Sequence, residues 1–240
     1  QALLAQLLPD RAEFGGLVTN LVTELKSRQV EIRLNTRVTA AMLGELAPDA
    51  AIIATGSAPV ETAVEGREAG HVITAQEILR GSAQAGSRVV VADWRCDWIG
   101  IGLAILLNRR GHHVRLAVNG ICAGQNLQQY LRDHWAGKLH EAGIEVIPYA
   151  QIYGVYGDTA YFLHGASSQP IVVEGVDTVV LASGNAPDMT LERELQGLSV
   201  PVVTVGDCTI ARSAEEAIYD GLVVTRSFLG ELIEASRLSA

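Results

Sequence analysis

Residues 89–104, which read VVVADWRCDWIGIGLA, run from an apolar strand through a charged turn into a helix that contains Gly100 and Gly102. A strand, a turn and a helix in this order can hold a diphosphate, because turn glycines let the backbone approach the phosphates and the first helical N–H groups point at them. Asp93 and Trp94 stand where the turn glycines are needed. A carboxylate beside a diphosphate costs about 1 kcal/mol per charge pair in water, and more when partly buried. The stretch therefore has the scaffold of a dinucleotide site with unfavourable residues in its turn.

The next strand of the same unit, residues 113–118, lacks a second feature of such a site. An acidic side chain at the end of this strand would bind the ribose hydroxyls, but residues 118–120 are Val, Asn and Gly. The turn after the first strand is also about two residues longer than a dinucleotide loop. We therefore expect no NAD(P) in this cleft.

A filled cleft is one alternative to a nucleotide site. Tryptophan side chains most often fill space, so we expect Trp94 and Trp98 to pack into the vacated cleft together with Arg95. Arg95 would then pair with Asp93 or Asp97. A second alternative is that the same turn contacts another protein surface.

Other residues that could do chemistry are isolated or diverge from one another. They are Cys96, Cys122, Cys208, His112, His113, Asp133, His134, Ser183 and Ser213. Scattered thiols indicate no disulfide framework and no metal site, adjacent histidines on a strand point to opposite faces, and helix neighbours diverge by about 100°. Neither serine has a His–Asp partner set. We predict no catalytic residue and no metal ligand in this chain.

Composition narrows the class of protein. The chain has 240 residues, of which 48% are hydrophobic, and a formal net charge of -9. No Lys/Arg-rich run offsets the acidic balance, so we expect no nucleic-acid partner. No apolar run reaches the roughly 18 residues that span a bilayer, and the first residues lack the basic flank of a signal peptide. We expect a cytoplasmic protein without membrane contact.

The first part of the chain predicts alternating helices and strands. A capping box at residues 10–13 and apolar residues at helical spacing predict a helix that ends near Arg28. The elements expected next are a strand at 30–34, a helical TAAMLGEL stretch, a strand at 50–54, a short helix capped by Thr74 and Glu77, and a linker at 81–87.

The second part predicts a parallel βαβαβ unit with right-handed crossovers. Its expected elements are strands at 89–92, 113–118 and 144–147 and helices at 98–110 and 127–142. Alternation over residues 149–173 predicts a small antiparallel meander. Strands at 178–182 and 202–205 and a final helix at 213–232 complete the prediction.

Two distant segments echo each other. Residues 49–59 read DAAIIATGSAP and residues 177–187 read DTVVLASGNAP, and each is an apolar strand followed by a glycine turn and a proline. The echo indicates two related nucleotide-binding folds, one inserted in the other. The predicted fold class is α/β, with two nested Rossmann-like domains, parallel sheets and a small antiparallel meander.

The paired ATG and ASG segments, together with TVGDC at residues 204–208, resemble the flavoprotein reductases that have two dinucleotide-binding domains. In that family the outer domain binds FAD and the inserted domain binds NAD(P). The resemblance implies that the aspartate of the Gly-Asp pair accepts hydrogen bonds from the FAD ribitol and that the next helix points its N-terminus at the flavin. Glycine permits close approach, and the free N–H groups of a helix favour an electron-rich partner. The expected cofactor-binding residues are Thr55, Gly56, Gly206, Asp207, Ser213 and Ala214.

Two further stretches, ADWRCDWIGIGLA and AVNGICAGQNLQQYLRDHW, resemble the C-terminal part of the trimethylamine dehydrogenase and 2,4-dienoyl-CoA reductase family of FMN/iron–sulfur oxidoreductases. Within it they look most like demethylases of N-methylated amino acids such as N-methylproline or dimethylglycine. In that family an FMN barrel and a 4Fe-4S cluster precede this part. The family's first Gly-x-Gly-x-x-Gly loop is missing before the helix that follows Asp10, so we interpret the chain as a C-terminal portion.

The resemblance implies a function for the whole protein. We expect oxidative demethylation of an N-methylated amine or amino acid, FAD or ADP in the outer domain, and FMN and 4Fe-4S upstream. The expected partners are the upstream FMN barrel, an electron-transfer flavoprotein and a second copy in a homo-oligomer, and the fragment itself would be inactive. The alternatives are an NAD(P)H-dependent enoyl or dienoyl reductase of the same family and a non-catalytic scaffold or interaction module. The expected domains are residues 1–82 and 186–240 for the FAD/ADP-binding fold and 83–185 for the insert.

Overall fold

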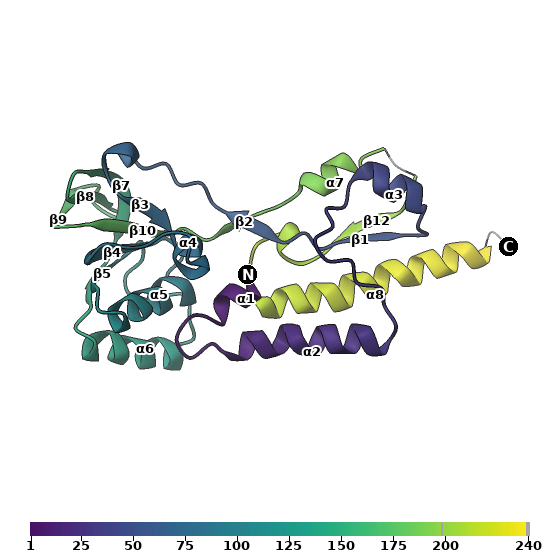
Figure 1. The fold of residues 1–240 in the computed structure, drawn as a ribbon, viewed down its shortest axis with the longest axis horizontal. Coiled ribbons are helices and arrows are strands. Elements are labelled where there is room, and N and C mark those ends of the chain that lie inside the picture. Colours follow the sequence, from purple (N-terminus) through teal and green to yellow (C-terminus); the bar gives the residue numbers. More distant parts are fainter. Residues whose placement is uncertain (198, 239–240) are drawn as a thin grey trace. The chain divides into compact units, whose positions relative to one another are not determined.

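The computed structural model describes residues 1–197 and 199–238, which form two compact units (Figure 1). Unit 1 consists of Gln1–Gln29 and Glu61–Gly184, and unit 2 consists of Val30–Val60 and the described residues from Asn185 onward. The α/β class, with parallel sheets and a small antiparallel meander, is confirmed.

Unit 1 contains a five-stranded parallel sheet in the order β3-β10-β4-β5-β6. Its strands are β3 (Val72–Thr74), β4 (Arg88–Asp93), β5 (His113–Val118), β6 (Glu145–Ile147) and β10 (Thr178–Ala182). The helices between them are α4 (Ala75–Arg80), α5 (Trp98–Arg109) and α6 (Gln129–Glu141). The predicted βαβαβ unit is present, and β3, which was not predicted, adds a strand at the other edge.

The two faces of this sheet are covered by different layers (Figure 1). Helices α5 and α6 pack on one face, and the meander of β7 (Ala150–Tyr156), β8 (Thr159–His164) and β9 (Pro170–Glu174) packs on the other. In β4, Val89 and Val91 belong to the core cluster with the helices, and Val90 and Ala92 belong to the cluster with the meander. Because both faces are buried, the strand reads as a continuous apolar run rather than an alternating one.

The N-terminal segment belongs to unit 1 as well. It contains α1 (Ala2–Ala5) and α2 (Glu13–Ser27), and the side chain of Leu8 packs against Gly102 in α5. The predicted capping box at residues 10–13 is wrong, because α2 begins without a side-chain cap. Asp10 has a positive φ of 59° and its carboxylate instead binds the Lys138 ammonium at 2.5 Å.

Unit 2 contains two small sheets. Strand β1 (Ala51–Ile53) pairs in parallel with β12 (Val202–Thr204), and β2 (Ser57–Pro59) pairs antiparallel with β11 (Asn185–Pro187). The two echo segments therefore pair with each other where they follow their glycine turns. The remaining elements are α3 (Ala40–Leu46), α7 (Thr190–Glu194), the 3-10 turn η2 (Gly206–Cys208) and α8 (Ala214–Leu238). A cluster of Ile53, Leu195 and Cys208 forms the core of this unit.

The predicted strand at residues 30–34 is wrong. These residues are irregular, and no described strand pairs with them, so their N–H and C=O groups have no ladder to join. The boundaries of the two compact units differ from those of the predicted domains. The chain returns to unit 1 at Glu61, because β3 pairs with β10. The nucleotide-binding domains predicted at 1–82, 83–185 and 186–240 remain a prediction.

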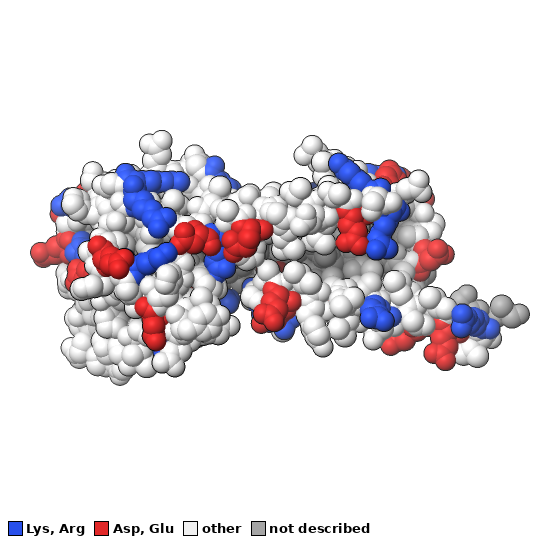
Figure 2. All heavy atoms as spheres, turned by 90° about the horizontal axis from the view of Figure 1, so that it is seen from below, with Lys and Arg blue, Asp and Glu red and all other residues white. Residues whose placement is uncertain are grey.

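Charged side chains of both signs are interspersed on the face drawn in Figure 2. Among the described helices, none combines the length and the apolarity that crossing a bilayer requires.

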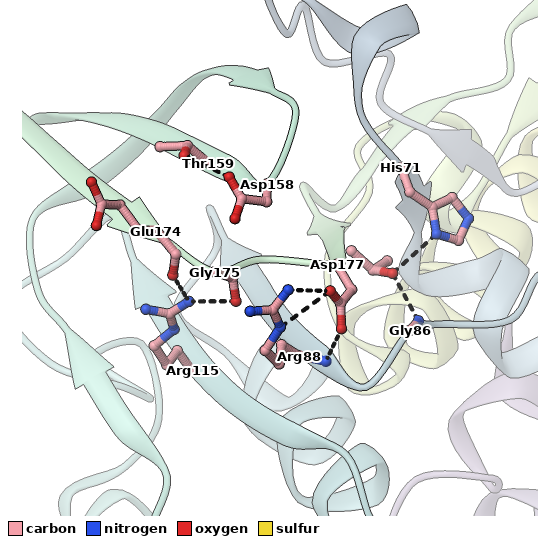
Figure 3. A network of polar contacts seen from close by, with 10 residues as sticks. His71, Gly86, Arg88, Arg115, Asp158, Thr159, Glu174, Gly175 and Asp177 are labelled. Carbon is pink, nitrogen blue, oxygen red and sulfur yellow. Dashed lines mark hydrogen bonds and ion pairs between the residues drawn. The ribbon is translucent and has the colours of Figure 1, made fainter.

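The amino ends of the sheet strands in unit 1 are closed by a polar network (Figure 3). Asp177 receives the backbone N–H of Arg88 at 2.8 Å and its guanidinium at 2.7 Å. Next to it, Thr178 is 1% exposed, and its hydroxyl accepts the N–H of Gly86 at 2.8 Å and lies 3.0 Å from His71 Nδ1. These contacts tie β10 to the segments that lead into β3 and β4.

Replacing Thr178 by valine tests this network. Valine keeps the shape and removes the hydroxyl, so the N–H of Gly86 loses its acceptor, and we expect a loss of about 1–3 kcal/mol in the free energy of unfolding. Urea denaturation followed by circular dichroism measures it. Thr159→Val is the control, because the Thr159 hydroxyl donates to the exposed Asp158, and its change should stay within about 0.5 kcal/mol. Equal effects of the two substitutions would contradict the role of Thr178.

Candidate functional site

The carboxyl ends of β1 and β12 lie at one edge of unit 2, because the two strands are parallel. Gly56 follows β1 and Gly206 follows β12, so the structure brings the two predicted glycine turns together. A hydrogen bond of 3.1 Å from the Ser57 hydroxyl to Asp207 Oδ2 links them. We call the edge formed by Thr55, Gly56, Gly206 and Asp207 the outer edge.

Gly56 leaves open space at the outer edge. Its φ is +79°, and, apart from its chain neighbours, no heavy atom of the described residues lies within 4 Å of where its β-carbon would be. The Thr55 hydroxyl donates to the carbonyl of Asp188 at 2.8 Å, and the N–H of Asp188 donates to the carbonyl of Gly56 at 3.0 Å. The turn is therefore held from the side of residue 188, and the glycine Cα side stays accessible.

Asp207 joins the outer edge to the start of α8. Its Oδ1 accepts the N–H of Arg212 at 3.3 Å, while Oδ2 accepts the Ser57 hydroxyl. Glu216 reaches back to accept the N–H of Ser213 at 3.0 Å and also its hydroxyl, which holds the pKa of Glu216 below its usual value. Ala214 is the first residue of α8. The helix start therefore already carries a carboxylate.

The six predicted cofactor-binding residues thus all lie in unit 2, on the two segments that follow β1 and β12. Four of them form the outer edge, and Ser213 and Ala214 stand at the start of the helix that follows it. Sequence reasoning missed Ser57, which bridges the two turns, and its signal would have been the hydroxyl directly after the glycine turn. Their binding role remains a prediction.

The altered turn of unit 1 is built around a buried carboxyl group. Asp93 is the last residue of β4, is 1% exposed and pairs with Ala182 of β10 and Val118 of β5. Its Oδ1 accepts the N–H groups of Arg95 at 3.1 Å and Cys96 at 2.9 Å. The other oxygen, Oδ2, is buried and has no hydrogen-bond partner among the described residues.

Gly100 makes room for this carboxyl group. A β-carbon at residue 100 would collide with Asp93 Oδ2. A glycine in the first turn of the helix is thus required by a side chain of the protein itself. Gly102, further along α5, supplies a packing contact for the side chain of Leu8.

Burial, together with the nearby charge of Asp97, raises the pKa of Asp93 to about 7. The N–H groups of Cys96 and Arg95 and the Arg95 charge act in the opposite direction but do not offset the loss of hydration. Burial also raises the pKa of the Cys96 thiol, to about 11, so this thiol is not an activated nucleophile.

Arg95 occupies the glycine turn at Gly184, which follows β10. Its Nε binds Asp97 Oδ2 at 2.9 Å, and Asp97 Oδ1 caps α5 by accepting the N–H of Ile99 at 3.0 Å. The aliphatic stem of Arg95 lies against Gly184, where φ is +86° and a β-carbon would collide with the Arg95 Cδ. The predicted pairing of Arg95 with Asp97 is confirmed. Gly184 is the echo of Gly56, so the same turn is occupied in unit 1 and open in unit 2.

Trp94 does not pack into the cleft, whereas Trp98 packs against the core of unit 1. Trp94 is 52% exposed, so the prediction that it packs into the cleft is wrong. Its N–H donates to the carbonyl of Ala182 at 3.3 Å. Trp98 packs edge-on against Trp135, with ring centroids 6.1 Å apart, and the Arg11 guanidinium lies 3.2 Å from the centre of its ring.

Two hollows of the structure lie away from the altered turn. One, of about 370 Å³, is lined by residues of α7 and β12 such as Leu195 and Val203, and another, of about 320 Å³, by residues such as Val38 and Met42. Both lie in unit 2. In the part of the chain that the structure describes, no three His, Cys, Asp or Glu side chains gather as metal ligands would.

The chain belongs to the pyridine nucleotide-disulphide oxidoreductase family, whose model matches residues 11–206. Membership of this family implies a domain that binds FAD. The resemblance to flavoprotein reductases is thereby confirmed.

The chain is similar to part of several larger oxidoreductases. An N,N-dimethylglycine/sarcosine dehydrogenase of Chromohalobacter salexigens is 26% identical over 271 aligned residues, which cover 95% of this chain and 38% of that protein. A 2-naphthoyl-CoA reductase has the same fold, with a TM-score of 0.81 at 24% identity, over 92% of this chain and 33% of the other. The 6-hydroxypseudooxynicotine amine oxidase of Pseudomonas geniculata N1 also gives 0.81 at 24% identity, over 91% and 35%. The chain thus spans about a third of the length of these proteins.

The raised pKa of Asp93 predicts a pH-dependent stability that Asp93→Asn removes. Because the folded pKa lies above the unfolded one, this group lowers stability as pH rises from about 4 to about 7 and adds no further change above that. The variant should therefore gain on the wild type by up to roughly 1.4 kcal/mol per pH unit across this window. Urea denaturation at pH 5, 6, 7 and 8 measures the difference. The exposed Asp158→Asn should show no such trend, and a constant difference for Asp93→Asn would contradict the expectation.

Proposed function

We propose that this chain is the nucleotide-binding-fold part of a flavin-dependent oxidoreductase that holds FAD or ADP at the outer edge and takes no NAD(P) at the altered turn. The contrast between Gly56 and Gly184 carries this proposal. The two glycines follow matching strands and have similar positive φ values, yet among the described residues only Gly184 has a side chain close to its β-carbon position. A ligand therefore finds backbone access at residue 56 and an arginine stem at residue 184.

The chemistry of the outer edge suits the hydroxyl groups of a nucleotide. Gly56 lets a ligand approach the backbone, and Asp207 is an acceptor for ribose or ribitol hydroxyls. Asp207 and Glu216 carry negative charge at the same place, which disfavours a phosphate there. We infer that this edge faces the sugar part and that the diphosphate is held elsewhere. FAD, when bound, supplies electron and hydride transfer.

For the whole protein we propose oxidative demethylation of an N-methylated amine or amino acid. The support is the likeness to the N,N-dimethylglycine/sarcosine dehydrogenase, of which this chain covers 38%. The reacting centre would then lie outside these residues, in an FMN barrel with a 4Fe-4S cluster. Since NAD(P) is excluded from the altered turn, electrons would leave to a flavoprotein acceptor. We further propose that the whole protein is cytoplasmic and forms a homo-oligomer.

Nucleotide titration of the intact protein that carries this chain tests the site. We expect saturable binding of FAD or ADP, and a loss of at least about tenfold in affinity for Asp207→Ala, because one charged hydrogen bond contributes about 1.5–3 kcal/mol. Isothermal titration calorimetry measures the affinity. Asp158→Ala, an exposed carboxylate in unit 1, should bind as the wild type does. Saturable micromolar binding of NADPH to the wild type would overturn the assignment of the altered turn.

Flavin absorbance tests the reaction. Under anaerobic conditions, sarcosine or dimethylglycine should bleach the flavin of the intact protein, and NADPH should leave it oxidised. Stopped-flow spectrophotometry follows the bleaching, with unmethylated glycine as the control substrate. The reverse pattern, bleaching by NADPH and none by the amines, would indicate the NAD(P)H-dependent enoyl reductase instead. No bleaching by either would favour a scaffold.

A further inference from the structure

Two side chains of the altered turn occupy the places where a dinucleotide would need free backbone. The carboxyl group of Asp93 lies on Gly100 in the first turn of α5, and the stem of Arg95 lies on Gly184 after β10. Both positions are at the carboxyl edge of the same parallel sheet, since β4 and β10 are paired neighbours. Open parallel sheets bind ligands outside this edge.

Resting on the function proposed above, we propose that Asp93 and Arg95 form an internal plug that is the specificity determinant of unit 1, and that removing both side chains re-exposes a binding site for an adenine or nicotinamide dinucleotide. The term plug refers to these two side chains throughout. The backbone that such a site requires is still present beneath them.

The carboxyl group of Asp93 occupies the backbone donors that could otherwise bind a phosphate. Its Oδ1 accepts the N–H groups of Arg95 and Cys96, which are successive backbone donors in the turn before a helix. Successive donors of this kind form a concave site that binds phosphate oxygens in nucleotide-binding loops. As long as the carboxyl group of Asp93 is there, these donors are engaged. Deleting it frees two N–H groups and the space over Gly100 together.

The cleft also has a surplus of acceptors. Asp93 Oδ2 and Asn119 Oδ1 are both buried without a hydrogen-bond partner among the described residues. The two are neighbours in the fold, because the N–H of Asn119 binds the carbonyl of Asp93 at 2.9 Å. A diphosphate brings further acceptors and negative charge, and each buried unpaired acceptor costs about 1–3 kcal/mol. Asp93 thus opposes the ligand by hydrogen bonding as well as by volume.

Arg95 closes the other side of the cleft and is itself held in place. Asp97 binds its Nε, and Asn126 donates to its backbone carbonyl at 2.6 Å. The turn is further fixed by Cys96, a non-glycine residue with a φ of +51° whose carbonyl accepts the N–H of Asn126. The side chain of Arg95 is 39% exposed, so its removal leaves the core of unit 1 intact.

A double variant tests the plug. Asp93→Ala combined with Arg95→Ala, made in the intact protein, should bind NADPH at least about tenfold more tightly than the wild type, which is about 1.4 kcal/mol. Isothermal titration calorimetry with NADPH and with ADP-ribose measures the gain. Arg132→Ala with Asp133→Ala is the matched control: it removes the same charges from the surface of α6 and should gain nothing.

Single variants separate the two side chains and guard against a folding failure. Arg95→Ala, at a partly exposed position, should gain about threefold over the control pair, whereas Asp93→Asn keeps the volume and an acceptor for the turn N–H groups and should gain nothing. Circular dichroism establishes that each variant is folded.

The outcomes distinguish the plug from the proposed function. A wild type that already binds NADPH overturns the proposed function. A wild type that does not, together with a folded double variant that does not, overturns the plug. If the double variant fails to fold, a folded Arg95→Ala protein that gains no affinity for NADPH overturns the plug equally. A gain in affinity for Asp93→Asn would also overturn it, because charge alone would then exclude the ligand.

Discussion

Asp93 is buried at the end of the central strand of unit 1, and the geometry around it follows from that burial. Its carboxyl group must have hydrogen-bond donors, which it takes from the turn that follows, and it must have space, which only a glycine at position 100 leaves. The turn is thereby fixed in a shape that puts Arg95 on Gly184 and exposes Trp94. A dinucleotide-binding scaffold has been stabilised by an internal group in place of an external one.

The scaffold itself could be read from the sequence. Buried parallel strands read as apolar runs, the stretches between them have the length of a helix and end at Gly111 and Gly143, and the meander alternates, so the βαβαβ unit and the meander were predictable. The short strands β2, β3 and β11 were not, because, unlike β1, they do not lie in a longer apolar run, and they form only where a partner strand is present. The strand predicted at residues 30–34 is absent although its residues favour a strand, because no described strand lies beside it as a partner.

The site was only partly predictable. The echo of Gly56 and Gly184 gave the two turns and their positive φ, since that is a property of the local backbone. Whether a glycine faces open space depends on side chains of other loops, and the sequence around the glycine does not indicate them. For the same reason Trp94 was expected inside and lies outside, while the pairing of Arg95 with Asp97, two residues apart, could be anticipated.

Unit 2 has few buried side chains of its own: Ile53, Leu195 and Cys208 form its core cluster, beneath a parallel sheet of two strands. Isolated sheets of this size have marginal cohesion. A molecule bound at the outer edge would contribute its binding free energy directly to folding, in proportion to the logarithm of its concentration over its dissociation constant. The melting temperature of unit 2 would then report the nucleotide supply around the protein, while that of unit 1, whose cleft is filled from within, would not.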